Sequence, residues 1–236
     1  MAYGIKLEVW GDFAAFNRPE MKVERVSYDV MTPSAARGIL EAIYWKPEMR
    51  WIVDEIHVLR PIAFTHIRRN EISSKIPISG PRGVKKAMKN GSGVIEIDVM
   101  DVRQQRADMV LRDVHYGISA HIEVLDPGSE KSPEAKHLDI FKRRASRGQY
   151  YHHPYLGVRE FPASFRLVEE IQSAPEELQG EHDLGYLLHD IEYIEHDEGT
   201  IIESHGGKRL QATPRFFRAT MKNGIIQVPP LSQSRA

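Results

Sequence analysis

The chain has 236 residues and no cysteine, which excludes disulfides, thiolate nucleophiles and cysteine-ligated zinc. No stretch is apolar over the length that spans a bilayer, so we expect a soluble, cytoplasmic protein with no membrane partner. The net charge of -1 hides strong segregation: residues 60–89 carry eight basic side chains and one acid, whereas residues 169–198 carry eleven acids and no lysine or arginine. Such segregation builds a positive surface of the kind that attracts nucleic acid, although blocks of like charge are also common on ordinary solvated faces.

The N-terminal part of the chain predicts a strand followed by a helix. Apolar and polar residues alternate over 5–9, the period of a half-buried strand, and Gly11-Asp12 is expected to end it. Thr32-Pro33 has the form of an N-cap followed by proline at the first helical position. We expect this helix to end near Trp45, because Pro47 cannot continue the hydrogen-bond ladder.

Two strands and a basic loop are expected next. Residues 51–59 alternate as a strand with one slip in phase. The side chains expected to face inward are Trp51, Val53, Ile56 and Val58. Pro61 is expected to open a hairpin to a strand over 62–67. The stretch 73–93 is rich in Gly, Pro, Ser and Lys and has no periodicity, which predicts a mobile basic loop.

The order of the elements predicts an α+β fold. Further strands are expected over 93–99 and 109–124, a helix over 132–146 and a last strand near Leu167. The order strand, helix, strand, strand, helix, strand is that of a ferredoxin-like (RRM-like) domain, in which helices back one face of an antiparallel sheet. The open face of such a sheet is a common platform for single-stranded RNA.

Two domains are predicted. Residues 1–168 form the ferredoxin-like domain, which includes the basic loop 73–93. Residues 169–236 form a small β-rich C-terminal domain, because an acidic connector leads into short β-prone runs around a Gly206-Gly207 turn. The β-prone runs are 184–194, 216–221 and 225–228.

Two histidines share the polar face of the strand predicted over 109–124. The apolar or aromatic face holds Tyr116, Ile118, Ala120, Ile122 and Val124, and the other face holds His115, Gly117, Ser119, His121 and Glu123. A histidine exchanges protons near neutral pH, as cleavage of RNA by its own 2′-hydroxyl requires. From this pattern alone His121 is either a catalytic residue or a solvated or RNA-stacking histidine. By periodicity, Tyr44 is a packing residue at the edge of an apolar helix stripe.

A basic cluster with aromatic neighbours follows the helix predicted over 132–146. Its members are Lys142, Arg143, Arg144, Arg147 and Arg159, beside Tyr150, Tyr151 and Tyr155. Arginines grip phosphates and aromatic rings stack on bases, which favours an RNA-binding surface over a capped helix end with solvated arginines. His137, His152 and His153 have no carboxylate at useful spacing, so neither a metal site nor a cofactor is predicted.

Three segments carry a resemblance to a known family. They are Tyr3-Gly-Ile-Lys-Leu-Glu-Val-Trp-Gly-Asp-Phe-Ala-Ala-Phe16, Ser34 to Trp51, and Phe141 to Gln149 running into Pro154-Tyr-Leu-Gly-Val-Arg-Glu-Phe161. They closely resemble the Cas-five-d family of type I-C CRISPR systems, RAMP-type proteins that process and hold RNA. The resemblance implies an endoribonuclease that cuts precursor CRISPR RNA at the 3′ base of its repeat hairpin. It also implies that the protein keeps the 5′ handle of the mature crRNA and joins the backbone and large subunits of an antiviral effector complex.

The resemblance also implies roles for particular residues. His121 and Tyr44 correspond to catalytic residues of the family, whereas the lysine that precedes the histidine in the family is Ala120 here. The cation that stabilises the phosphate must therefore come from another position. The candidates are Lys46, Arg68, Arg106 and the Arg143-Arg144 pair, and with Arg69, Arg147 and Arg159 they make up the predicted RNA-binding residues.

Three functions remain open from the sequence. The preferred hypothesis is metal-independent cleavage that gives a 2′,3′-cyclic phosphate and a 5′-hydroxyl. The alternative is a non-catalytic subunit that binds the crRNA 5′ handle, to which the change at Ala120 points. Sequence-independent binding of duplex DNA through residues 75–89 is the third.

Overall fold

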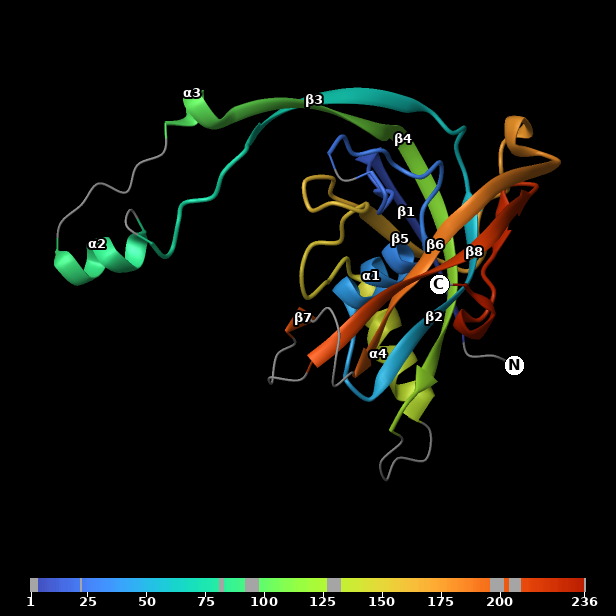
Figure 1. Ribbon diagram of the computed structural model, residues 1–236. Helices are drawn as coiled ribbons and strands as arrows, with labels where there is room; N and C mark the ends of the chain where they lie inside the picture. Colours follow the sequence, from blue (N-terminus) through green and yellow to red (C-terminus); the bar gives the residue numbers. More distant parts are fainter. Residues whose placement is uncertain are drawn as a thin grey trace.

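The computed structural model of the chain describes residues 4–21, 23–80, 83–91, 98–126, 133–195, 202–203 and 209–235. Its strands form one antiparallel sheet in the order β5-β1-β4-β2-β9-β8-β6, with β3 also paired to β4 and β7 to β8 (Figure 1). The strands are β1 Gly4–Ala14, β2 Met49–Val58, β3 Phe64–Ile72, β4 Arg103–Val124, β5 Ser164–Val168, β6 Glu181–Glu195, β7 Ile202–Glu203, β8 Arg209–Lys222 and β9 Ile225–Gln227. The α-helices are α1 Pro33–Ile43, α2 Val84–Asn90, α3 Val99–Val102 and α4 Pro133–Ser146. The predicted α+β class is confirmed.

Helix α1 begins and ends where the sequence predicts. Thr32 is the N-cap, and its Oγ1 accepts a hydrogen bond from the backbone N–H of Ala35 at 3.3 Å. The helix ends at Ile43, ahead of Pro47. The guanidinium of Arg144 donates to the carbonyl of Ile43 at 3.1 Å and so satisfies one of the free acceptors at this helix end.

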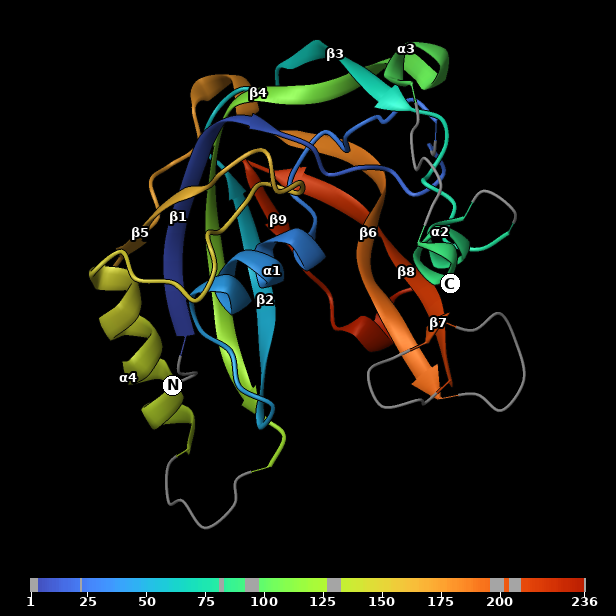
Figure 2. The ribbon, with the colours of Figure 1, turned by 90° about the vertical axis from the view of Figure 1, so that its left-hand side faces the viewer.

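Two helices cover one face of the sheet. Figure 2 shows α1 and α4 on the same side of β1, β2 and β4. Trp51 of β2 packs edge-on against Phe141 of α4, with ring centroids 4.7 Å apart. The register places Trp51 opposite Ile122 of β4, and both are buried. The face that these residues share is therefore the helix-covered face, and the polar residues between them lie on the other, here called the open face.

The predicted slip in phase of β2 is a β-bulge. The register of β2 against β4 shifts between Val53 and Glu55, which leaves Asp54 as the extra residue. The four side chains expected to face inward, Trp51, Val53, Ile56 and Val58, are all buried.

Four local predictions need correction. β1 runs past Gly11-Asp12 to Ala14, because β4 continues to pair with it. β3 pairs with β4 and forms no hairpin with β2. The predicted loop 73–93 contains α2, which sequence periodicity missed because this helix is short and buries no residue. Most of the strand predicted over 93–99 lies outside the described residues, but Val99 begins α3 and is not in a strand.

β3 and the first half of β4 form an arm that projects from the body and carries α2 and α3 (Figure 1).

The C-terminal segment holds strands β6 to β9, and these strands extend the first sheet. β9 pairs with residues 55–57 of β2, so hydrogen bonding is continuous across the predicted boundary at residue 168. Leu187 and Phe217 share one hydrophobic core with the N-terminal strands. The predicted Gly206-Gly207 turn lies outside the described residues. Within the described part of the chain, no helix combines the length and apolar character that a membrane crossing needs.

Candidate active site and RNA-binding surfaces

His121 lies on the open face of β4 and is held by a carboxylate. Its Nδ1 is 2.9 Å from both Oδ1 and Oδ2 of Asp54. A carboxylate only accepts hydrogen bonds at neutral pH, so Nδ1 carries the proton and donates it. This leaves Nε2 of the neutral ring with a free lone pair. The two side chains are 36% and 43% exposed, so an RNA strand can reach them.

The β-bulge of β2 aims Asp54 at His121. In the ladder Ile52 stands opposite His121 and Val53 opposite Ala120. As the residue inserted at the bulge, Asp54 turns toward the open face, and its carbonyl accepts a hydrogen bond from the N–H of Val228 at 2.9 Å. The bulge therefore supplies the partner that fixes the orientation of the imidazole.

A groove of about 1140 Å³ begins at this pair. It runs between residues 50–54 of β2, the start of α1, residues 189–193 of β6 and the loop 228–232. Charged and titratable residues along it are Arg37, Arg50, Asp54, His121, Glu123, Glu134, His189, Asp190, Glu192 and Tyr193. Acids outnumber arginines, so the groove itself does not attract phosphate strongly, and the positive charge for RNA binding must lie around it.

Tyr44 is not brought together with His121. It is buried on the helix-covered face, where its hydroxyl lies 2.9 Å from Nδ1 of the buried His137. The guanidinium of Arg144 lies over its ring at 5.3 Å, and its carbonyl accepts a hydrogen bond from Nε1 of Trp51 at 2.9 Å. These contacts fix the junction of α1 and α4, as the periodicity of the helix alone indicates.

Two of the predicted RNA-binding arginines stabilise the base of the arm. Arg69 forms ion pairs with Asp108, at 2.8 Å, and with Glu160. Nε of Arg106 lies 3.2 Å from Glu71, which also pairs with Arg25. Their charges are largely neutralised within the protein, and their first role is to join β3, β4 and the neighbouring loops.

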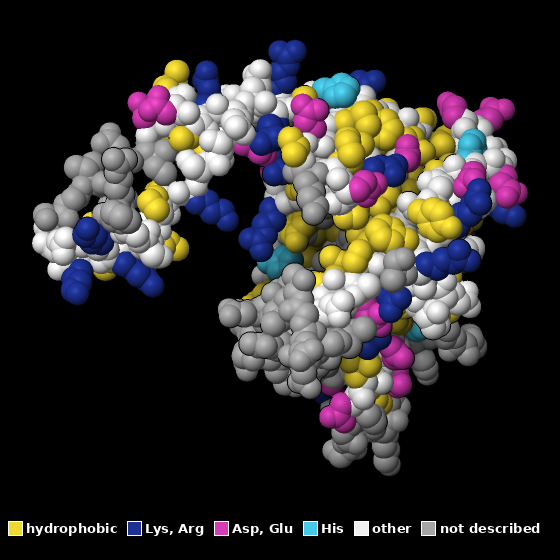
Figure 3. All heavy atoms as spheres, in the orientation of Figure 1, with side chains coloured by type: hydrophobic (Ala, Val, Ile, Leu, Met, Phe, Trp, Pro, Cys, Tyr) yellow, Lys and Arg dark blue, Asp and Glu magenta, His cyan; other side chains and the backbone are white. Residues whose placement is uncertain are grey.

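Other predicted cations are exposed. Arg68 is an exposed residue of β3, and Lys46 is an exposed residue that follows α1. Arg143, Arg147 and Arg159 are exposed near the C-terminal end of α4 and in the loop after it. Figure 3 shows further Lys and Arg side chains on the tip of the arm and on the side of the body that faces it.

The C-terminal end of α4 forms a basic-aromatic surface, made of Lys142, Arg143, Arg147, Tyr150 and Tyr151. A shallow hollow of about 510 Å³ lies beside it, lined by Arg144 and residues 148–151. Tyr151 is 85% exposed although the N–H of its backbone is bonded to Ala42 of α1. A fixed backbone with a free ring is suited to stacking on a base.

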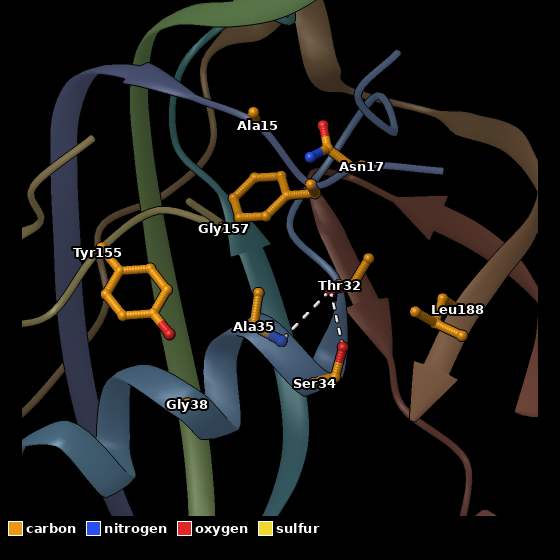
Figure 4. A pocket seen from close by; sticks show the side chains of 10 residues that line it. Ala15, Asn17, Thr32, Ser34, Ala35, Gly38, Tyr155, Gly157 and Leu188 are labelled. Carbon is orange, nitrogen blue, oxygen red and sulfur yellow. Dashed lines mark hydrogen bonds between the residues drawn. The ribbon is translucent and has the colours of Figure 1, made fainter. Parts of the chain in front are cut away.

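The segment from Pro154 to Phe161 closes over the end of β1. Leu156 is fully buried, and its carbonyl accepts a hydrogen bond from the N–H of Ala15 at 3.0 Å. Gly157 has a φ of +85°, and a Cβ there would lie 2.0 Å from the carbonyl oxygen of Ala15. Only glycine fits this position. Figure 4 shows the cavity of about 300 Å³ that this turn forms with the start of α1, lined by Thr32 among others.

Nearly all of the described residues fall within a match to a protein family. Residues 4–229 match the family model described as CRISPR-associated protein (Cas_Cas5), Cas5d type. A protein of Mannheimia succiniciproducens is 48% identical over 236 residues, which cover 98% of this chain and 96% of that protein. A protein of Thermus thermophilus is 42% identical over 231 residues, which cover 95% and 91%. This chain belongs to the Cas5d family.

Both relatives are named CRISPR pre-crRNA endoribonuclease Cas5d. A solved crystal structure of a CRISPR-associated protein has the same fold as this Cas5d chain, with a TM-score of 0.63 at 23% identity, over 99% of this chain and 95% of that one. The resemblance expected from the three sequence segments is therefore confirmed. In one of those segments, Pro154 to Phe161, the packing of this fold explains the residue types.

Sequence reasoning missed Asp54. The phase slip between Val53 and Ile56 is visible in the sequence, and two adjacent acidic residues occupy it. Together these two features could have indicated a bulge with a carboxylate on the open face. Among the described residues, no three of the metal-ligating types His, Cys, Asp and Glu come together as a possible metal site.

Proposed function

We propose that this Cas5d chain is an endoribonuclease that cleaves precursor CRISPR RNA at the 3′ base of the repeat hairpin and retains the 5′ handle. The observation that carries the proposal is the exposed imidazole of His121, held through Nδ1 by Asp54 at the mouth of a groove. The printed activity of two relatives that share nearly the full chain supports it. The order β5-β1-β4-β2, with α1 and α4 on one face, supports the ferredoxin-like interpretation of the platform.

The proposed chemistry needs no metal ion. Nε2 of His121 accepts the proton of the 2′-hydroxyl, and the 2′-oxygen forms a bond to phosphorus. The bond from phosphorus to the 5′-oxygen breaks, and that oxygen takes a proton from water. The hydroxide left behind removes the proton from His121, which returns to its neutral form. The products are a 2′,3′-cyclic phosphate and a 5′-hydroxyl, so atoms and charge balance without a co-reactant.

Two substrates test this mechanism. The protein is incubated in EDTA with its cognate repeat RNA and with the same RNA carrying one 2′-deoxy substitution just upstream of the scissile phosphate. We expect cleavage of the first only, because the second lacks the nucleophile. Cleavage of the deoxy substrate, or loss of cleavage in EDTA, would contradict the mechanism.

The second candidate function is a subunit that binds the 5′ handle without cutting it. Two observations favour it: Ala120 supplies no cation, and the basic-aromatic surface lies on the helix side of the molecule, away from His121. His121→Ala separates the two functions. The enzyme loses cleavage and keeps RNA binding, whereas a pure binding subunit shows no cleavage before or after the substitution.

The surface of the arm supports the proposal that this protein assembles with other subunits of an effector complex. Its exposed apolar side chains are Ile72, Ile76, Ile78, Met88, Val99 and Met100. An apolar surface of this kind on a projecting element marks a contact with another protein. Lys85, Lys86 and Lys89 of α2 lie on the same arm, so duplex DNA is a further possible ligand. Competition between hairpin RNA and duplex DNA at matched salt decides between specific RNA binding and general phosphate binding.

A further inference from the structure

A lysine lies on the same face of the sheet as His121. Lys6 belongs to β1, where its neighbour Ile5 is buried, so Lys6 points to the open face. In the register of β1 with β4, Lys6 stands opposite Ser119 and Gly4 stands opposite His121. Because Gly4 has no side chain, the diagonal neighbour of the imidazole is Lys6, at a backbone distance of about 7–8 Å that a lysine side chain can span.

The charge of Lys6 acts over the open face. The pKa of Glu55 in β2 is lowered mainly by the hydrogen bond that Gln227 donates, against the opposing effect of burial. The neighbouring His57 lowers this pKa further, and the positive charge of Lys6 makes the smallest contribution in the same direction. Lys6 of β1 and Glu55 of β2 both pair with Ser119 of β4, one on each side of that strand. The ammonium group is therefore within electrostatic reach of the far side of β4. Among the described residues, Glu55 is the carboxylate that responds to this charge, and its ion pair is with His57 and not with Lys6.

We propose that Lys6 and Asp54 complete the reactive centre around His121, an inference that rests on the endoribonuclease function proposed above. Lys6 is a catalytic residue whose ammonium group binds the non-bridging oxygens of the scissile phosphate and stabilises the negative charge that develops during attack. Asp54 is a positioning residue that fixes the ring so that Nε2 faces the 2′-hydroxyl. Lys6 thus supplies the cation that Ala120 cannot.

Other cations fit this role less well. Arg50 also lies on the open face, but its guanidinium is 3.8 Å from Glu123, which offsets its charge. Arg37, on the far side of the groove, pairs with Asp190. The cations that the sequence suggested lie along the arm or near the junction of α1 and α4.

Cleavage by variants of the full-length protein tests the inference. Single-turnover rates are measured in EDTA for Lys6→Met, Lys6→Arg and Asp54→Asn, with RNA affinity measured at the same salt. The control is Lys222→Met, which removes an exposed lysine of β8 that is paired with Glu181. We expect Lys6→Met to lose about 10²-fold in rate, Lys6→Arg to recover most of it, and Lys222→Met to match the wild type.

Asp54→Asn tests positioning by separating the rate of the chemical step from RNA affinity. The charged and titratable groups around His121 are Asp54, Glu55 and Arg50 of β2, Lys6 of β1, Glu123 of β4, and His189, Asp190 and Glu192 across the groove. Among the described residues, Asp54 is the hydrogen-bond partner of the imidazole. An asparagine there holds the ring less firmly, so we expect the single-turnover rate to fall about 10-fold while RNA affinity stays at the wild-type value. A structural role alone would lower affinity and rate together, and a wild-type rate would overturn the positioning role.

The outcomes separate this inference from the function on which it rests. If the wild type cleaves and Lys6→Met cleaves as fast as Lys222→Met, the role of Lys6 is overturned and the endoribonuclease stands. A larger loss with Arg50→Met than with Lys6→Met assigns the cation to Arg50 and overturns it as well. Binding without cleavage by the wild type overturns both.

Discussion

Two histidines on the same face of β4 have different environments. Nε2 of His115 lies 3.5 Å from Oε2 of Glu8, a fully buried carboxylate, and Ile171 fills the space beside Gly117 on the same strand. His121 contacts Asp54, and both side chains are more than one-third exposed. The alternation of residues along β4 is the same for the two histidines, so it predicts only the face of the sheet on which they lie. The segments packed over that face decide whether each histidine is structural or reactive.

The comparison is tested most strongly by removing each imidazole. His121→Asn is expected to lower the rate of RNA cleavage by about 10²–10⁴-fold, because the proton acceptor is lost, while RNA affinity is kept. His115→Asn is expected to stay within about threefold of the wild-type rate, since this ring lies within the fold and off the groove. Single-turnover cleavage with a parallel binding assay measures both. Equal losses in the two variants would mean that the environments do not separate the roles.

Glu8→Gln tests whether Glu8, the neighbour of His115, stabilises the fold. The carboxylate accepts hydrogen bonds from Nη2 of Arg166 at 2.7 Å and from the N–H of Gln172 at 3.3 Å, so it ties β1 to the connector after β5. We expect the substitution to lower the free energy of unfolding by about 1–3 kcal/mol, because a charge-assisted hydrogen bond is weakened in a buried place. Urea unfolding at neutral pH measures this. Unchanged stability together with lost cleavage would instead place Glu8 in the reaction.

The environments of Glu8 and His115 also predict how the stability of the fold depends on pH. Burial raises the pKa of Glu8, but hydrogen bonds from Arg166 and Gln172 outweigh it and hold the pKa below its ordinary value of 4.5. A carboxyl group with a lowered pKa in the folded state stabilises the fold above about pH 4.5 and loses this contribution as the pH falls through the lowered pKa. Burial lowers the pKa of His115 from 6.5, so its protonation below that pH also favours unfolding. Urea unfolding of the wild type and Glu8→Gln, followed from pH 7 to well below pH 4.5, should therefore show a difference that is steady above about pH 4.5 and shrinks below it. A difference that stays constant would contradict the assignment.

Tyr44→Phe is expected to have the smallest effect. It removes one buried hydroxyl that contacts His137, which is worth about 1 kcal/mol of stability, and leaves the open face intact. Cleavage should stay within about threefold of the wild-type rate. A loss as large as that of His121→Asn would show that Tyr44 takes part in the reaction, as the family resemblance implies.

Local signals in the sequence predicted most of the sheet and both long helices. The alternation of β1 and β4 and the Thr32-Pro33 cap act between residues close in the chain, so they are visible without a fold. The phase slip of β2 was visible in the sequence, but the bulge at Asp54 that causes it was not predicted. Helix α2 was missed because it has no buried face to impose a period.

Contacts between distant residues could not be predicted in the same way. Asp54 meets His121 only because β2 and β4 pair in one register, and β9 meets β2 only because the sheet extends beyond residue 168. Tyr44 finds His137 through the packing of α1 against α4. Each of these depends on long-range geometry, which composition and spacing do not contain.

The most direct test is to observe the histidines while RNA is bound. The protein is labelled with ¹⁵N-histidine and titrated with repeat RNA that carries the 2′-deoxy substitution, so that the complex forms without cleavage. We expect the Nε2 signal of His121, assigned with His121→Asn, to shift on binding, while the signals of His115 and His137 stay in place. A shift of His137 with His121 unchanged would contradict a reactive centre on the open face.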